Sequence, residues 1–259
     1  MRLPTLTLLC ALFSILAPCA QPDVKEIIRR SVEANQRDFK AVDSYNNKER
    51  DRTPGGGSKT YQITMIEGTP YQRLIGVNGK PLPASQEAAE KQKEQQARQQ
   101  RHSESSGDRQ KRIQKYERGR TRDNTMMQQL TEAFNFTLVG QHKVRGYTVY
   151  VLKATPKAGY KPPNMDSEVL PGMQGELWID EKSFQWVKVT AQVIRPVSIA
   201  GFLARVEPGT RFELEKAPVG DGSIWFPSHF VEKANAKVLG FFNHNSFEDD
   251  TFWDYQPVK

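Results

Sequence analysis

The chain has 259 residues, and 37 Lys or Arg against 30 Asp or Glu give it a formal net charge of +7. Residues 91–122 hold eleven Lys or Arg and four Asp or Glu, so this segment carries the whole excess and the remainder is neutral. A local basic block with Tyr116 as its one aromatic residue disfavours a nucleic-acid-binding protein, in which aromatic residues usually alternate with the positive charges.

The first twenty residues are typical of a secretory signal peptide. Arg2 precedes an apolar stretch at 3–17, and small residues follow up to Ala20. The stretch is too short and too interrupted for a spanning helix. We therefore expect a protein that is periplasmic or secreted after cleavage. A lipid anchor at Cys19 is the alternative, which the preceding Pro18 disfavours.

Residues 21–259 are expected to form a single domain. Cys10 and Cys19 both lie in or beside the leader, so the mature chain has no internal disulfide and depends on core burial. A chain of this length can bury a sizeable core.

The mature chain is expected to begin with an amphipathic helix, because Val24, Ile27, Ile28 and Val32 recur at helical spacing after Asp23. Strands follow to about residue 77. Residues 84–133 then read as a helical insertion whose first part lacks an apolar face. Disorder of that first part is the alternative.

Strands resume at Phe134 and continue to the end of the chain. Alternation at 187–193 places Val187, Val189 and Val193 on one side of a strand. Roughly ten strands without a βαβ rhythm predict a mainly β (α+β) fold with an antiparallel sheet that is strongly curved or partly closed.

Motifs for catalysis or metal binding are not found. No Gly-x-Ser-x-Gly elbow occurs, and the glycine-rich stretch at 55–60 is better explained as a hairpin turn. His244 with Glu248, Asp249 and Asp250 is the one local cluster of metal-type ligands, but consecutive acids on a strand point to different faces. We expect no enzyme activity, no cofactor and no metal.

The predicted strands carry many aromatic residues, including all four tryptophans. These residues either form an ordinary core or line an apolar hollow for a ligand, as curved sheets can enclose greasy molecules. The basic segment is either a solvated helix or a contact for anionic membranes or a partner.

Gly-Glu-Leu-Trp-Ile-Asp at 175–180 and the return strand at 184–189 resemble a hairpin of the outer-membrane lipoprotein-sorting (LolA/LolB-like) superfamily. The segment at 223–227 is similar to a later strand of the same superfamily, and the stretches at 70–75 and 79–82 are similar to its exported relatives. The resemblance implies a half-barrel sheet of roughly ten strands, with a concave apolar face that receives lipid chains beneath an N-terminal helix and a helical insertion. The long basic segment departs from the family pattern.

The expected function is therefore binding of acyl chains of lipoproteins or lipids, in lipoprotein sorting or lipid transport. The candidate cavity and lid residues are Met126, Met127, Leu130, Leu177, Trp178, Val187, Val189, Val193, Trp225 and Phe230. The candidate membrane or partner contacts are Arg109, Lys111, Arg112 and Lys115. The alternative function is a protein-interaction or envelope-sensor module that docks a membrane-bound partner through the basic insertion. No nucleic-acid partner is expected.

Overall fold

The computed structural model describes residues 23–201, 204–238 and 242–258. The expected signal peptide and Cys19 lie outside these residues. Within them, none of the helices combines the length and the apolar character that crossing a bilayer requires.

Three α-helices are present in the described part of the chain. Helix α1 spans Val24–Ala41 and begins at Asp23, whose side chain accepts a hydrogen bond from the Lys25 backbone N–H at 3.0 Å. Helices α2 (Ala84–Ser103) and α3 (Ser106–Ala133) form the predicted insertion. Both parts of the insertion are helical, with a break at Glu104 and Ser105 between them, and α2 has no buried residue, as its lack of an apolar face predicted.

The strands form one antiparallel sheet, which is open and curved. Along the sheet the order is β4-β3-β2-β1-β13-β12-β11-β8-β7-β6-β5, with β9 and β10 attached beside β12. The expected curved sheet is thus confirmed, with more strands than predicted because three short ones were missed. Strand bounds are β1 Tyr45–Arg52, β2 Ser58–Ile66, β3 Thr69–Val77, β4 Lys80–Pro81, β5 Phe134–Val144, β6 Tyr147–Pro156, β7 Met173–Asp180, β8 Trp186–Val193, β9 Val197–Ile199, β10 Ala204–Val206, β11 Arg211–Val219, β12 Ile224–Val238 and β13 Phe242–Pro257.

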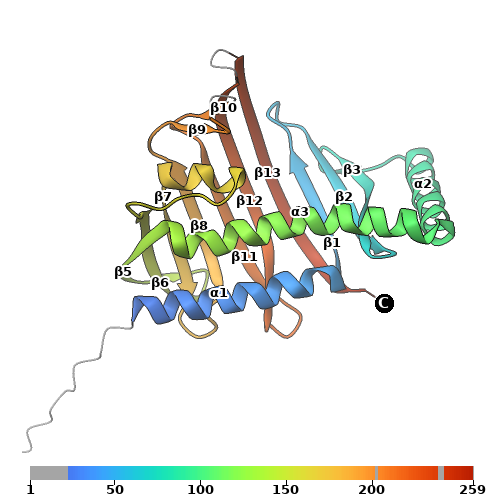
Figure 1. Ribbon diagram of the computed structural model, residues 1–259. Coiled ribbons are helices and arrows are strands. Elements are labelled where there is room, and N and C mark those ends of the chain that lie inside the picture. Colours follow the sequence, from blue (N-terminus) through green and yellow to red (C-terminus); the bar gives the residue numbers. More distant parts are fainter. Residues whose placement is uncertain (1–22, 202–203, 239–241, 259) are drawn as a thin grey trace, which may run out of the picture.

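Helices α1 and α3 lie side by side across one face of the sheet (Figure 1). Helix α3 packs against β3 near one end of the strand order and against β5 at the other end, so it crosses the sheet like a strap. Helix α2 packs against β3. The 3-10 segment η2 (Met165–Gly172) packs against α3 and β9.

Side chains on the two faces of the sheet form two separate apolar groups. The helix-side core joins α1 and the end of α3 to the sheet and includes Ile27, Leu152 and Ile179, each 2% exposed or less. The outer cluster lies on the other face and consists of Val149, Val151, Val187 and Trp225, with Trp178 and Tyr147 packed against it. Because neighbouring residues of a strand point to opposite faces, the strands contribute to both groups.

The predicted alternation of β8 is wrong at Val187. Val189 and Val193 belong to the helix-side core, whereas Val187 belongs to the outer cluster. The register explains the difference, because Trp178 pairs with Lys188 while the next residue, Ile179, pairs with Trp186. Val187 is the extra residue of a β-bulge, and a bulge changes which face the following side chains occupy.

A buried polar cluster fastens α1 to the sheet. The Lys216 ammonium on β11 donates to the Asn35 side-chain oxygen at 2.8 Å and forms an ion pair with Asp38. Asp38 also accepts from the Gln185 amide at 3.0 Å and from the Trp225 backbone N–H at 3.1 Å. Lys216 is 6% exposed and Asp38 3%, so each charge depends on its partners for the solvation that water would otherwise give. Burial lowers the pKa of Lys216.

Replacing Asp38 by Ala is expected to lower the free energy of unfolding by about 3–5 kcal/mol, because it leaves the Lys216 charge buried and unpaired. Urea unfolding followed by tryptophan fluorescence measures the change. Glu33→Ala, at an exposed position of the same helix, is the control and should change stability by less than about 0.5 kcal/mol. A second variant that combines Asp38→Ala with Lys216→Met should recover part of the loss. An Asp38→Ala loss no larger than that of the control would contradict this role.

Candidate functional site

A groove about 670 Å³ in volume lies between α1, the end of α3 and the start of β5. This volume falls within the usual range of small-molecule sites. Its apolar lining comes from Val24, Ile28, Val32, Phe134 and Phe136, and its polar lining from Lys25, Arg29, Glu33, Gln36, Thr131 and Asn135. We call this feature the α1–β5 groove.

The α1–β5 groove is continuous with the helix-side core. Ile28 and Phe134 are buried members of that core, and Phe136 is a partly buried residue packed against it. Met127 and Leu130, in the turn of α3 just before the groove, also pack against the core while staying half-buried. The floor of the groove is therefore formed by part of the helix-side core.

The predicted cavity residues divide between the two faces. Leu177, Val189 and Val193 are buried in the helix-side core, and Met127 and Leu130 pack against it. Phe230 pairs with Leu214, which packs on the same core, so Phe230 shares that face and is half-buried. Met126 lies in α3. Leu177, Val189, Val193, Met127, Leu130 and Phe230 are not among the residues that line the α1–β5 groove.

Trp178, Val187 and Trp225 lie on the opposite face, in or against the outer cluster. Trp225 is 3% exposed and packs edge-on against Tyr147 with ring centroids 4.9 Å apart. The Lys188 ammonium lies 5.1 Å from the centre of the Trp178 ring. The structure therefore does not bring these three residues together with Leu177 and Val189, and one ligand site cannot contain both sets.

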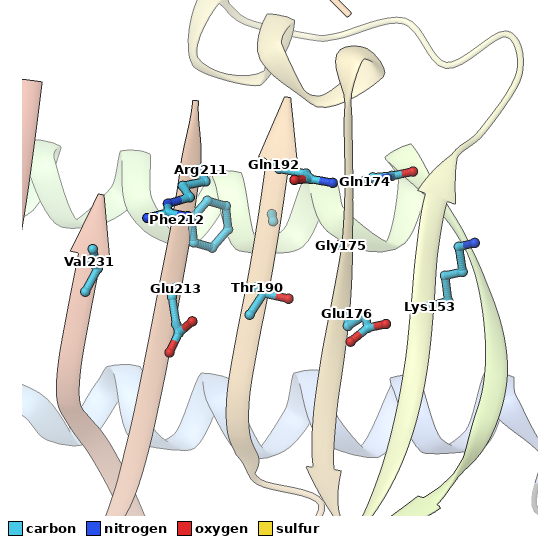
Figure 2. Close-up of a pocket in the computed structure, with 11 residues that line it drawn as sticks. Lys153, Gln174, Gly175, Glu176, Thr190, Gln192, Arg211, Phe212, Glu213 and Val231 are labelled. Carbon is cyan, nitrogen blue, oxygen red and sulfur yellow. The ribbon is translucent and has the colours of Figure 1, made fainter. Parts of the chain in front are cut away.

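The outer face also has a polar hollow of about 540 Å³, shown in Figure 2. Its charged and amide side chains come from β6, β7, β8 and β11, and the helix ribbons lie behind these strands in this view. They are Lys153, Gln174, Glu176, Gln192, Arg211 and Glu213. The hollow's apolar side chains are Ala191, Phe212 and Val231, whereas five larger or branched apolar side chains line the α1–β5 groove, so the groove is the better candidate for a hydrocarbon chain.

Three of the four predicted basic contacts form ion pairs within the chain. Arg112 forms an ion pair with Glu104 and donates to the Thr69 hydroxyl at 2.6 Å, and Arg109 forms an ion pair with Glu67 at 2.8 Å. These contacts join α3 to the β2–β3 turn. Lys111 forms a longer ion pair with Asp108 of the same helix at 3.8 Å, but its side chain is 82% exposed. Lys115 is also exposed, so both ammonium groups are accessible to solvent.

An acidic cluster on the helix side of the sheet was missed at the sequence level. Glu49 and Asp51 of β1 and Asp250 of β13 each place a carboxylate oxygen within 4.8 Å of the others. Glu49 and Asp51 are two residues apart, which places them on the same face of a strand. The pairing of β1 with β13, which brings Asp250 beside them, is not visible in the sequence of either strand. Of the four residues grouped as metal-type ligands in the sequence, Asp250 alone belongs to this cluster.

Burial and the closeness of the negative charges raise the pKa values of the carboxyl groups in this cluster. Burial, followed by the charge of Asp51, raises the pKa of Glu49 to about 7. Burial, together with the neighbouring Glu248 carboxyl, raises the pKa of Asp250 to about 8. Burial also raises the pKa of Asp51. Carboxylates so close together resist being ionised at the same time.

Comparison with known proteins gives likenesses to solved structures. Neither a protein-family model nor a curated protein matches the chain. A LolA superfamily protein from Nitrosomonas europaea is 11% identical, with a TM-score of 0.35 over 92% of this chain and 94% of that one. A domain named for outer-membrane lipoprotein sorting, from Vibrio parahaemolyticus, is 11% identical with a TM-score of 0.32, over 89% and 93% of the two chains.

A third likeness is to a DUF1329 family protein from Desulfovibrio piger, at 10% identity and a TM-score of 0.31 over 92% of this chain and 94% of that one. These structures are of the kind that the sequence resemblance named. At such low identities and TM-scores they say nothing about the ligand, so we derive function from the chain's own residues.

Arg112→Ala is expected to lower the free energy of unfolding by about 1–3 kcal/mol, because Glu104 and the Thr69 hydroxyl each lose a charged hydrogen-bond donor. Lys111→Ala, at the neighbouring exposed position, should change it by less than about 0.5 kcal/mol. Thermal unfolding of both variants measures the difference. Equal stability of the two variants would show that the contacts of Arg112 do not hold the insertion in place.

Because of the acidic cluster, we expect the free energy of unfolding to fall as the pH rises from 5 to 8. The measurement is made in buffer that contains a metal chelator. In this interval the folded chain retains protons on Glu49 and Asp250 that the unfolded chain has already lost, so deprotonation favours unfolding. Asp250→Asn should flatten the slope. Urea unfolding at pH 5, 6, 7 and 8 tests this, and a wild-type slope that the substitution leaves unchanged would contradict it.

Proposed function

We propose that this chain is an exported, non-catalytic binding protein that accommodates an acyl chain of a lipoprotein or lipid on the helix side of its sheet. The observation that carries the proposal is the α1–β5 groove, whose apolar lining includes Phe136 together with Ile28 and Phe134 of the helix-side core. The proposed ligand enters there with its hydrocarbon facing the core.

The energetics favour a hydrocarbon ligand. Each CH₂ group transferred from water to an apolar site contributes about 0.8 kcal/mol, so several buried groups outweigh the loss of freedom on binding. The polar lining at Lys25, Arg29 and Glu33 lies on the exposed side of α1, where it can contact a headgroup without charge burial. Arg29 is partnered by Glu26 and Glu33, so the groove has both charge signs at its rim.

We expect the end of helix α3 to act as an adjustable cover over the α1–β5 groove. It packs against β3 and β5 at the two ends of the sheet, and its last turns place Met127 and Leu130 half-buried on the helix-side core. Methionine is flexible and polarisable, which allows the same surface to pack against chains of different shape. A small displacement of the end of α3 would enlarge the groove without breaking a strand pairing.

The proposed location is the periplasm or the exterior, since the leader pattern at residues 1–20 predicts export. Lys111 and Lys115 on α3 are the proposed residues for attraction to an anionic membrane, while Arg109 and Arg112 hold the insertion. Such attraction weakens as salt is added.

Phe136→Glu is expected to weaken uptake of a fluorescent fatty acid at least tenfold, because it places a charge in the apolar lining of the groove. Displacement titration with palmitate, followed by fluorescence, measures the affinity. Val139→Glu is the matched control, since Val139 lies on the same strand but is 57% exposed and outside the groove.

Circular dichroism of both variants establishes that they are folded. Saturable uptake by wild type and control with loss in Phe136→Glu supports the groove as the site. Uptake unaffected by Phe136→Glu, or no uptake by the wild-type chain, would contradict the proposal.

A further inference from the structure

Strand β5 forms one edge of the sheet (Figure 1). In the part of the chain that the structure describes, β6 is the one strand that pairs with it, so the other side of β5 carries unpaired backbone N–H and C=O groups. The strand has 11 residues and no proline, and Lys143 near its far end is its one Lys, Arg, Asp or Glu. A long edge of this kind can accept a further strand.

The other ends of the sheet are short. Strand β4, at the opposite edge, has two residues and ends in Pro81, and β9, at the end of the side branch, has three residues. Short strands and proline are common means by which proteins keep a sheet edge from pairing with another chain. Strand β5 has neither, and its Val139 is 57% exposed. An added strand would cover part of this apolar side chain.

The β5–β6 hairpin determines which backbone groups of β5 face outward. A two-residue turn with positive φ at both residues, Arg145 and Gly146, joins the strands, and the pair of residues that flanks such a turn is hydrogen-bonded. Hydrogen-bonded pairs alternate with non-hydrogen-bonded pairs along an antiparallel ladder. Gln141 and Lys143 therefore direct their backbone N–H and C=O groups away from β6, where an added strand can reach them.

The same strand begins in the α1–β5 groove. Phe134, Asn135 and Phe136 line the groove, and the edge of β5 continues from them toward the β5–β6 turn. At about 3.3 Å per residue, the stretch from Thr137 to Lys143 has room for about six residues of an added strand. A ligand that consists of an acyl chain followed by an extended polypeptide can therefore occupy the groove and the edge together.

We propose that the free edge of β5 pairs with the polypeptide that follows the acylated residue of a lipoprotein, while the acyl chain lies in the α1–β5 groove. This inference rests on the proposed function and narrows its ligand class from acyl lipids in general to acylated polypeptides. In a lipoprotein the acyl groups are carried by the first residue, so the polypeptide starts where the hydrocarbon ends. An acyl chain in the groove places that start beside Phe136, and the following residues run along β5 in the parallel direction.

The shape of the edge favours a peptide over a second copy of this chain. The register of β5 on β6 shifts between Leu138 and Gly140, which makes Val139 the extra residue of a bulge. The bulge interrupts the even spacing of the outward backbone groups, and a second β5 strand with the same rigid bulge matches this spacing poorly. A peptide without fixed structure can adapt to it, and backbone pairing places few demands on the sequence of the peptide.

The test compares palmitoyl ligands by displacement of the fluorescent fatty acid. A palmitoylated peptide of six residues should bind at least tenfold more tightly than palmitoyl-glycine, because it adds backbone hydrogen bonds to β5. Two further peptides carry N-methyl groups on one or the other alternate set of amides. Because alternate residues of a strand face the same neighbour, one of these peptides should lose the tenfold gain and the other should keep it.

Gln141→Pro is the corresponding change in the protein. It removes an outward N–H of β5 without removing a hydrogen bond to β6. This variant should lose most of the gain in affinity for the palmitoylated peptide and take up palmitate as the wild type does. Gln141→Ala, which keeps the backbone N–H, is the matched control and should bind both ligands with the wild-type affinity.

Equal affinities for the palmitoylated peptide and palmitoyl-glycine would overturn the inference, as would two N-methylated peptides that both keep the gain. Normal uptake of palmitate in that case would leave the proposed function in place, whereas no uptake of palmitate would contradict the proposed function and this inference with it. Light scattering provides a further check. A wild-type dimer that Gln141→Pro converts to a monomer would show that a second copy occupies the edge, and the inference would then be wrong.

Discussion

The ion pair between Lys216 and Asp38 is the contact on which the arrangement of this molecule depends. It joins the first helix of the described chain to β11, and Asp38 also accepts hydrogen bonds from Gln185 and the Trp225 backbone. Such a buried pair adds little net stability compared with apolar packing, but it permits few other orientations of α1. The position of α1 in turn defines one wall of the α1–β5 groove.

With α1 fixed in this way, the helix side of the sheet has two regions of different character. Near β5 to β8 and β11, apolar side chains form the helix-side core, part of which lines the α1–β5 groove. Near β1 and β13, the same face carries the acidic cluster, with Phe230 between the two regions. We expect a hydrocarbon ligand to be stabilised in the first region, whereas the carboxyl groups of the second region disfavour one.

The sequence predicted the fold well where patterns are local. The helical spacing of Ile27 and Ile28 identified α1, and the absence of an apolar stripe identified α2 as a solvated helix. It failed at Val187, because a β-bulge is determined by the register of two strands and not by the residues of one.

The candidate site could be predicted only in part, for the same reason. Leu177 and Val189 were recognised as apolar strand residues and do face the helices. Trp178 and Trp225 are also apolar strand residues, but they lie on the opposite face of the sheet. The groove residue Phe136 and the acids Glu49 and Asp51 were missed, because their neighbours come from segments distant in the chain: α1 for Phe136 and β13 for the acids. Local sequence patterns show which residues are apolar or charged, while long-range pairing decides which of them meet.

The central claim is that the helix side of the sheet accommodates a hydrocarbon chain supplied from outside the protein. Native mass spectrometry of the mature chain, purified without detergent from the envelope of its own cells, tests this most directly. We expect a species heavier than the bare chain by the mass of an acyl lipid or lipopeptide, and release of that mass on collisional activation. A single species at the mass of the bare chain, which stays unchanged after incubation with fatty acid, would show that the helix side does not hold a hydrocarbon chain.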